Sequence, residues 1–164
     1  MPTTYEPLAT TTLGSAAATV SFTSISGSYT DLVLVMNTIG TSAGGDVQAQ
    51  FNSDTGSNYS CTILYGTGSA AGSTRQSSVS SILLDYYAEL NTAVSNRIVS
   101  IQNYSNTTTY KTLLSRANNA GLGVDAIVGL YRSTSAITSI LIKISNANTF
   151  ATGSTFTLYG IKSA

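Results

Sequence analysis

The segment YTDLVLVMNTI, residues 29–39, is the most strongly apolar part of this sequence. Its centre, Leu32 to Met36, is a run of apolar residues with Asp31 before it and Asn37 after it. A short apolar run bounded by turn-forming residues is typical of a β-strand that is covered on both faces. We therefore expect this segment to be a central strand, with the rest of the chain packed around it.

Outward from this segment, the chain repeats short runs rich in β-branched and aromatic residues. The predicted strands are residues 19–25, 47–52, 58–65, 79–87, 97–104, 110–118, 124–132, 137–145 and 154–162. Loops rich in Ser, Thr, Asn and Gly separate most of them, and no amphipathic helix lies between strands, which favours an antiparallel sandwich over βαβ units. We expect an all-β, antiparallel, jelly-roll-like β-sandwich. Its predicted core contains Leu32, Leu34, Ile140, Ile142, Phe156 and Leu158.

Two stretches of the middle region are predicted to have no strand. Residues 66–75, GTGSAAGSTR, are rich in Gly and Ser and are expected to be a flexible surface loop. Their glycine spacing does not fit a dinucleotide-binding fingerprint, and the stretch lacks the lysine of a phosphate-binding loop. Residues 88–96 contain no Gly or Pro, and one or two helical turns are expected there.

At 164 residues, the chain is long enough for one domain with a single core. Residues 1–18 are rich in Thr, Ala and Ser and lack strand alternation, so we expect an extended N-terminal arm followed by a sandwich domain at 19–164. Tyr5, Leu8 and Leu13 are the large apolar side chains of this arm. We expect them to bind a neighbouring chain or the flank of the sandwich itself, because the arm is too polar to order alone.

The composition is unusually poor in charge. Only 9% of the residues are charged, against about 25% in typical soluble proteins. Ser and Thr together make up roughly three residues in ten, and the net charge is zero. A surface without net charge has no mutual repulsion to oppose association. We therefore expect a protein whose surface is largely used in an assembly, with a homotrimer or a high-copy lattice contact as its form.

Several function classes lack their usual residues. The sequence contains no histidine, which excludes Ser-His-Asp and Cys-His nucleophiles. Its one cysteine, Cys61, forms no intrachain disulfide and no cysteine-based zinc site. The zero net charge is not typical of a nucleic-acid binder, and we expect no nucleic-acid partner. No apolar run is long enough to span a membrane and no signal peptide is recognisable, so we expect no membrane partner.

The remaining candidate sites rest on acids and tyrosines. Asp85 and Glu89 are close in sequence, but a glycosidase needs two carboxyl groups that face each other across a sugar, and ordinary surface acids are the simpler interpretation. Asn52, Asp54 and Asn58 offer oxygen ligands for Ca²⁺, against the alternative of Asx-turn hydrogen bonds. The ten tyrosines suit sugar stacking or a protein interface, although most are expected in the core. We expect no catalytic residue and no cofactor.

Three segments carry a resemblance to a known group of proteins: SYTDLVLVMNTI at 28–39, FNSDTGSNYSCTILYGTGS at 51–69 and FATGSTFTLYGIKSA at 150–164. Together with the start of the chain, they resemble small β-sandwich structural proteins of tailed-bacteriophage virions, particularly phages of aquatic bacteria and cyanobacteria. Such modules are separate head or tail proteins, or form the tips of longer fibres. No catalytic motif comes with this resemblance.

The resemblance implies a non-enzymatic structural protein of the virion. The first hypothesis is a capsid decoration or cement protein, or another head-surface or tail-surface component, with major capsid or tail proteins as its partners. The alternative is a receptor-binding module at the tip of a tail fibre that recognises glycans on the host surface. In both cases the expected location is the virion, after synthesis in the host cytoplasm.

Overall fold

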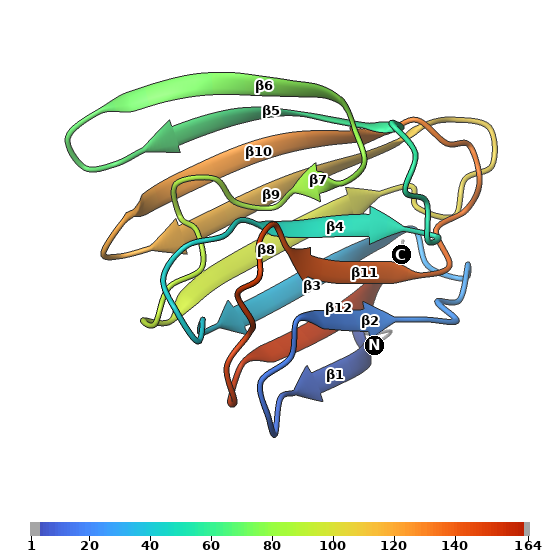
Figure 1. Ribbon diagram of the computed structural model, residues 1–164. Coiled ribbons are helices and arrows are strands. Elements are labelled where there is room, and N and C mark those ends of the chain that lie inside the picture. The colour runs from blue at the N-terminus through green and yellow to red at the C-terminus, as the bar shows by residue number, and fades with distance from the viewer. Residues whose placement is uncertain (1–3, 163–164) are drawn as a thin grey trace.

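The computed structural model describes residues 4–162, and these form an all-β protein of two antiparallel sheets without a helix (Figure 1). The larger sheet has the order β1-β12-β3-β8-β9-β10-β5-β6, and the smaller has the order β2-β11-β4-β7. The larger sheet consists of β1 (Tyr5–Thr12), β3 (Asp31–Thr38), β5 (Tyr59–Gly66), β6 (Ala71–Val79), β8 (Ser95–Gln102), β9 (Lys111–Asn119), β10 (Gly123–Tyr131) and β12 (Thr155–Ile161). The smaller sheet consists of β2 (Thr19–Phe22), β4 (Val47–Phe51), β7 (Ile82–Leu83) and β11 (Ile140–Ile144).

The predicted β-sandwich is confirmed: the smaller sheet packs on one face of the larger one. Several consecutive strands alternate between the sheets, for example β1 and β3 in the larger sheet and β2 and β4 in the smaller. Crossings of this kind are a feature of double-sheet jelly rolls. The jelly-roll topology itself stays a prediction.

The apolar segment at residues 29–39 contains β3, which lies between β12 and β8 in the larger sheet. Its inward-facing residues Leu32, Leu34 and Met36 are buried, whereas Val33 and Val35 on the opposite face are only half-buried. The expectation of a strand covered on both faces is therefore wrong for the outer face, where no second layer lies among the described residues.

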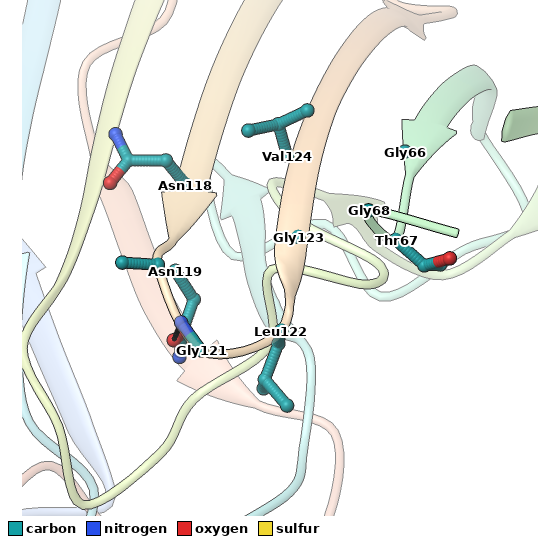
Figure 2. Close-up of a pocket in the computed structure, with 10 residues that line it drawn as sticks. Gly66, Thr67, Gly68, Asn118, Asn119, Gly121, Leu122, Gly123 and Val124 are labelled. Carbon is teal, nitrogen blue, oxygen red and sulfur yellow. Dashed lines mark hydrogen bonds between the residues drawn. The ribbon is translucent and has the colours of Figure 1, made fainter. Parts of the chain in front are cut away.

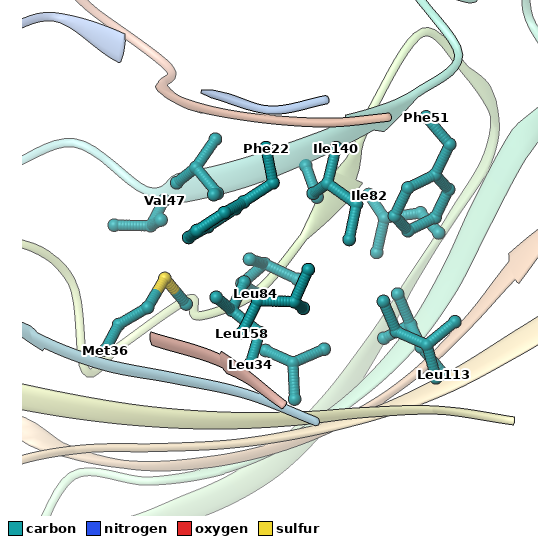
Figure 3. Close-up of a cluster of buried hydrophobic side chains, with 14 of the residues drawn as sticks. Phe22, Leu34, Met36, Val47, Phe51, Ile82, Leu84, Leu113, Ile140 and Leu158 are labelled. Atoms are coloured by element: carbon teal, nitrogen blue, oxygen red, sulfur yellow. The ribbon is translucent and has the colours of Figure 1, made fainter. Parts of the chain in front are cut away.

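The core lies between the two sheets, where Phe22, Val47 and Ile140 of the smaller sheet meet Leu34, Met36 and Leu158 of the larger sheet (Figure 3). All six residues predicted for the core are buried: Leu32, Leu34, Ile140, Ile142, Phe156 and Leu158. Period-2 alternation placed these side chains correctly, because every second residue of a strand faces the same side.

Three predicted segments differ from the structure. Residues 66–75 form only a short turn before β6 begins at Ala71, because the backbone of this polar stretch pairs with β5. Residues 79–87 contribute the last residue of β6 and the two-residue strand β7, and the chain after β7 is irregular. The helical turns predicted at 88–96 are absent from the described chain, which reaches β8 without a helix.

The segment at 1–18 is also different from the prediction, because Tyr5–Thr12 form the edge strand β1, paired with β12. Met1, Pro2 and Thr3 lie outside the described residues, as do Ser163 and Ala164. Residues 5–12 of the expected arm thus belong to the larger sheet of the sandwich. Its backbone hydrogen bonds, which do not require an apolar side-chain pattern, fix it there.

Candidate functional site

The three arm residues lie on the flank of their own sandwich. Leu8 and Leu13 are partly buried and pack against the core, while Tyr5 is 58% exposed. The Tyr5 ring makes an edge contact with Tyr159 on β12, at 6.3 Å between ring centroids. Lys162 pairs with Glu6 at 3.0 Å, which adds a surface ion pair at the same edge. Of the two expected docking positions, the described residues occupy the chain's own flank.

A hollow of about 530 Å³ lies beside this edge, where the two sheets separate. Leu8 and Tyr29 line it, together with the segment 21–26 that includes the end of β2. The acid at its rim, Glu6, is already paired with Lys162, and this pairing lowers the pKa of Glu6. The hollow therefore offers backbone and hydroxyl groups but no unpaired charge.

A second hollow, of about 450 Å³, lies between the β5–β6 turn and the β9–β10 hairpin (Figure 2). Its lining contains Gly, Asn, Thr, Ala, Leu and Val residues and no acid, base or thiol. The two turns approach so closely that a Cβ on Gly123 would lie 2.4 Å from the carbonyl oxygen of Gly66. Gly123 therefore serves close backbone packing, and no phosphate-binding arrangement accompanies it.

The calcium candidates Asn52, Asp54 and Asn58 belong to the turn after β4. Asp54 accepts hydrogen bonds from the Gly56 N–H and the Asn58 side-chain amide, both at 2.8 Å. Asn52 Oδ1 accepts the Thr138 N–H at 2.8 Å, so it faces a different loop. These oxygens are engaged in hydrogen bonds within the protein, and the Asp54 contacts form an Asx turn.

Asp85 and Arg97 form an ion pair in the interior, where both side chains are fully buried. Arg97 also donates hydrogen bonds to the Thr38 and Ser95 hydroxyls, and the other Asp85 oxygen accepts the Val47 N–H at 2.8 Å. Burial raises the pKa of Asp85 to about 7, while Arg97 and the Val47 N–H act in the opposite direction. Because every polar group of the pair has a partner, its position indicates a structural role.

The proposed alternative for Asp85, catalysis with Glu89, has no support in this geometry. Asp85 is fully buried and paired with Arg97, and Glu89 accepts a hydrogen bond from the Gly45 N–H at 3.0 Å. Among residues 4–162, no group of three or more His, Cys, Asp or Glu side chains is placed to hold a metal ion. None of the described segments is a helix long and apolar enough to cross a membrane.

A buried carboxylate that sequence reasoning missed, Asp125 on β10, fixes the loop after β7. Its two oxygens accept the backbone N–H groups of Tyr86, Tyr87 and Ala88, at 2.7, 3.2 and 2.8 Å. Carboxyl oxygens are strong acceptors for backbone amides. The loop is therefore held rigidly against the sheet although it has no regular secondary structure.

This clamp positions a cluster of three tyrosines, which we call the tyrosine cluster: Tyr65, Tyr86 and Tyr87. Tyr65 contacts Tyr87 at 4.4 Å and Tyr86 at 5.7 Å between ring centroids. Tyr87 is 40% exposed. Tyr65 and Tyr86 are partly buried against the interior. A partly exposed aromatic face is suited to a carbohydrate or to a protein surface.

Alternation along the strands is the signal that identifies Arg97 and Asp125 as interior residues. Arg97 shares a face with Val99 and Ile101 on β8, and Asp125 shares one with Ile127 on β10. A charged residue in phase with core positions is buried only when it is paired.

No protein-family model matches this chain, and no curated protein matches it significantly.

Proposed function

We propose that this chain is a non-enzymatic structural protein of a bacteriophage virion, as a capsid decoration or cement protein or another component of the head or tail surface. Major capsid or tail proteins are its partners, and the chain itself forms a homo-oligomer. The proposal combines the resemblance of three sequence segments to virion β-sandwich proteins with the character of the folded surface.

The surface is the observation that carries the proposal. Of seven basic and seven acidic residues, most are buried or half-buried; Arg75 and Arg116 are exposed, and the exposed Lys162 is paired with Glu6. At the same time, large apolar side chains such as Leu64 and Val124 are about 60% exposed. A surface poor in charge and rich in apolar groups favours permanent association over a free soluble existence.

The test is to quantify this chain in purified particles of the phage that encodes it, relative to the major capsid protein. A decoration or cement protein gives hundreds of copies per particle, and a tail-surface component gives far fewer. Gold-labelled antibodies against the chain then locate it on the head or on the tail. Absence of the chain from purified particles would contradict the proposal.

The second candidate is a receptor-binding module that recognises glycans on the host surface, and the tyrosine cluster favours it. The rigid loop presents Tyr87 beside Tyr65, so little side-chain freedom is lost when a sugar ring stacks on them. Thr74 and Gln76 on the same face of β6 add polar groups near this surface.

This candidate is tested by binding the purified chain to an array of bacterial surface glycans. Tyr87→Ala should abolish any binding that uses the cluster. Tyr110→Ala is the matched control, because Tyr110 is a comparably exposed tyrosine, at 55%, outside the cluster. Equal loss in both variants, or binding that survives Tyr87→Ala, would contradict a glycan site at the cluster.

A further inference from the structure

The outward-facing side of β10 is entirely aliphatic. Its residues Val124, Ala126, Val128 and Leu130 alternate with the inward-facing ones, and Val124 and Val128 are 58% and 57% exposed. An antiparallel sheet that faces water on one side normally carries polar residues there. Strand β10 instead has the pattern of a strand with both faces covered, although no described residue covers its outer face.

The neighbouring strands extend this apolar surface. Leu114 on β9 lies opposite Val128, and Leu64 on β5 lies opposite Ala126. Ile98 on β8 lies in the row of Ala126 and Leu64, separated from Ala126 by Arg116 on β9. We call this surface the outer patch, and it consists of Leu64, Ile98, Leu114, Val124, Ala126 and Val128. Five of its six residues are among the exposed large hydrophobic side chains of the described chain.

Two arginines lie within or beside the outer patch, and they are placed asymmetrically about β10. Arg116 on β9 lies opposite Ala126, which itself lies opposite Leu64 on β5. Arg75 on β6 lies opposite Thr62, two strands from β10. Neither arginine forms a salt bridge with a described residue, and the outward positions of β5, β6, β8, β9 and β10 include no acid.

We propose that the outer patch is the contact between two copies of this chain, related by a two-fold axis along β10. Such an axis places Val124, Ala126 and Val128 against their own equivalents, as a closed symmetric contact requires. It also places Arg116 of one copy over Leu64 of the other, because both lie one strand from β10 in the same row.

The same axis places Arg75 over Ser100 of the second copy. Arg75 lies two strands from β10 on one side, and Ser100 on β8 lies two strands away on the other side, in the same row. Each cation thus faces an aliphatic or hydroxyl group and not the same cation. Arg75, on the edge strand β6, keeps its guanidinium group in water at the rim. Arg116 starts within the patch, where its long alkyl stem covers apolar surface.

The size of this surface agrees with a stable dimer. Five strands about 4.8 Å apart, with four outward residues about 6.8 Å apart on each, give a flat footprint of roughly 600 Å². Side-chain relief increases this toward the accessible area of about 800 Å² that each partner buries in a standard interface. The remaining strands of the larger sheet, β3, β12 and β1, lie on one side and enlarge the available area further.

The test is sedimentation equilibrium of the purified chain over a wide concentration range. We expect dimers in the wild type and, in Val128→Lys, a dissociation constant raised roughly tenfold or more, because this residue lies on the proposed axis, where the two introduced charges would face each other. Val94→Lys is the matched control, since Val94 is also a valine, 55% exposed, but lies in the loop before β8. It should dimerise like the wild type, and circular dichroism should show all three chains folded.

Thiol cross-linking gives a second, independent measurement. A bis-maleimide that spans the roughly 10 Å between packed sheets should join two copies of Val128→Cys and give no larger species. It should not join Val94→Cys, and the native Cys61 is buried. A monomeric wild type at high concentration, a trimer, or equal behaviour of the Val128 and Val94 variants would overturn the proposal. Because only the purified chain is used, the result stands whether or not the chain proves to be a virion component.

Discussion

Leu34 shows how single residues hold the two sheets together. It lies in β3 with its Cα opposite Leu158 on one side and Val99 on the other, and all three side chains are buried. Leu34→Ala should lower the free energy of unfolding by about 2–5 kcal/mol, because transfer energy is lost and a cavity remains. Urea denaturation measures this, with Val33→Ala as the control on the half-buried outer face. An equal cost for both variants would contradict the assigned core face.

Asp46 and Asp54 should affect stability with opposite dependence on pH. Burial and the charge of Glu89 raise the pKa of Asp46. Hydrogen bonds from Asn58 and the Gly56 N–H lower the pKa of Asp54. In the folded protein, Asp46 thus holds its proton more tightly than in the unfolded chain, where the pKa is about 3.9, and Asp54 holds it less tightly.

The sign of the stability change in each Asp→Asn variant follows from the direction of the pKa shift of the acid it replaces. The stability contributed by Asp46 is present below the unfolded pKa and is lost as pH rises through the raised folded pKa. The contribution of Asp54 is present above the unfolded pKa and is lost as pH falls through the lowered folded pKa. From about pH 2.5 to pH 7, Asp46→Asn should therefore gain stability relative to the wild type, and Asp54→Asn should lose it. Thermal unfolding at both pH values measures the two differences, and the same sign for both would contradict the assignment.

At the scale of elements, β1 changes what is expected when the N-terminal segment is altered or removed. A free arm can be removed without affecting the fold, whereas β1 pairs along its length with β12 and carries Leu8 against the core. Leu8→Ala should lower the free energy of unfolding by about 1–2 kcal/mol, the transfer energy of a partly buried leucine. Tyr5→Ala, at an exposed position of the same strand, should change it by less than about 0.5 kcal/mol. Two equally small effects in denaturant titrations would restore the arm interpretation.

The elements that sequence reasoning identifies have a recognisable pattern of apolar side chains. Strand β3 is predicted from a continuous apolar run and the strand that contains Ile140 from alternation, and the core residues of both are buried. Strand β6, AGSTRQSSV, has no such alternation, because an edge strand is held mainly by backbone hydrogen bonds to β5. Backbone pairing leaves no signature in side-chain composition, so β1 and β6 were both missed.

The candidate sites depend even more on long-range pairing. Tyr65 and Tyr87 were recognisable only as members of a tyrosine-rich chain. They meet because β5 pairs with β10 and because Asp125 of β10 clamps the loop that carries Tyr87. Likewise, the aliphatic outer face of β10 is visible in the sequence, but its flanking Leu64 and Leu114 are identified only from the register. Residues far apart in sequence cannot be assigned to one surface without the sheet order.

For the whole molecule, the first and last strands complete the larger sheet side by side. Tyr5 lies opposite Ile161, and the Lys162 N–H donates a hydrogen bond to the Thr4 carbonyl at 3.2 Å. This arrangement makes the fold depend on contacts between distant parts of the chain, which is typical of slowly folding β-proteins. It also means that the order of the strands along the chain can be altered without disturbing the sheets.

A circularly permuted chain tests this property. We expect that joining residue 162 to residue 4 with a short Gly/Ser linker, and opening the chain between Gly68 and Ser69, preserves the fold. Both residues are exposed in the β5–β6 turn, and a side chain added at Gly68 would meet no atom within 4 Å. Exposed turns of this kind are the sites where permutation usually succeeds.

The matched control opens the same joined chain between Tyr87 and Ala88, in the loop whose amides bind Asp125. A break there removes the covalent link between two amides that the buried carboxylate holds together, and it places charged ends beside a buried acid. We expect the first permutant to melt within a few degrees of the wild type and the second to melt far lower or to aggregate, as measured by circular dichroism. If both permutants are equally stable, the hydrogen bonds to Asp125 do not organise this loop. If both unfold, residues 4 and 162 do not lie side by side as the pairing of β1 with β12 requires.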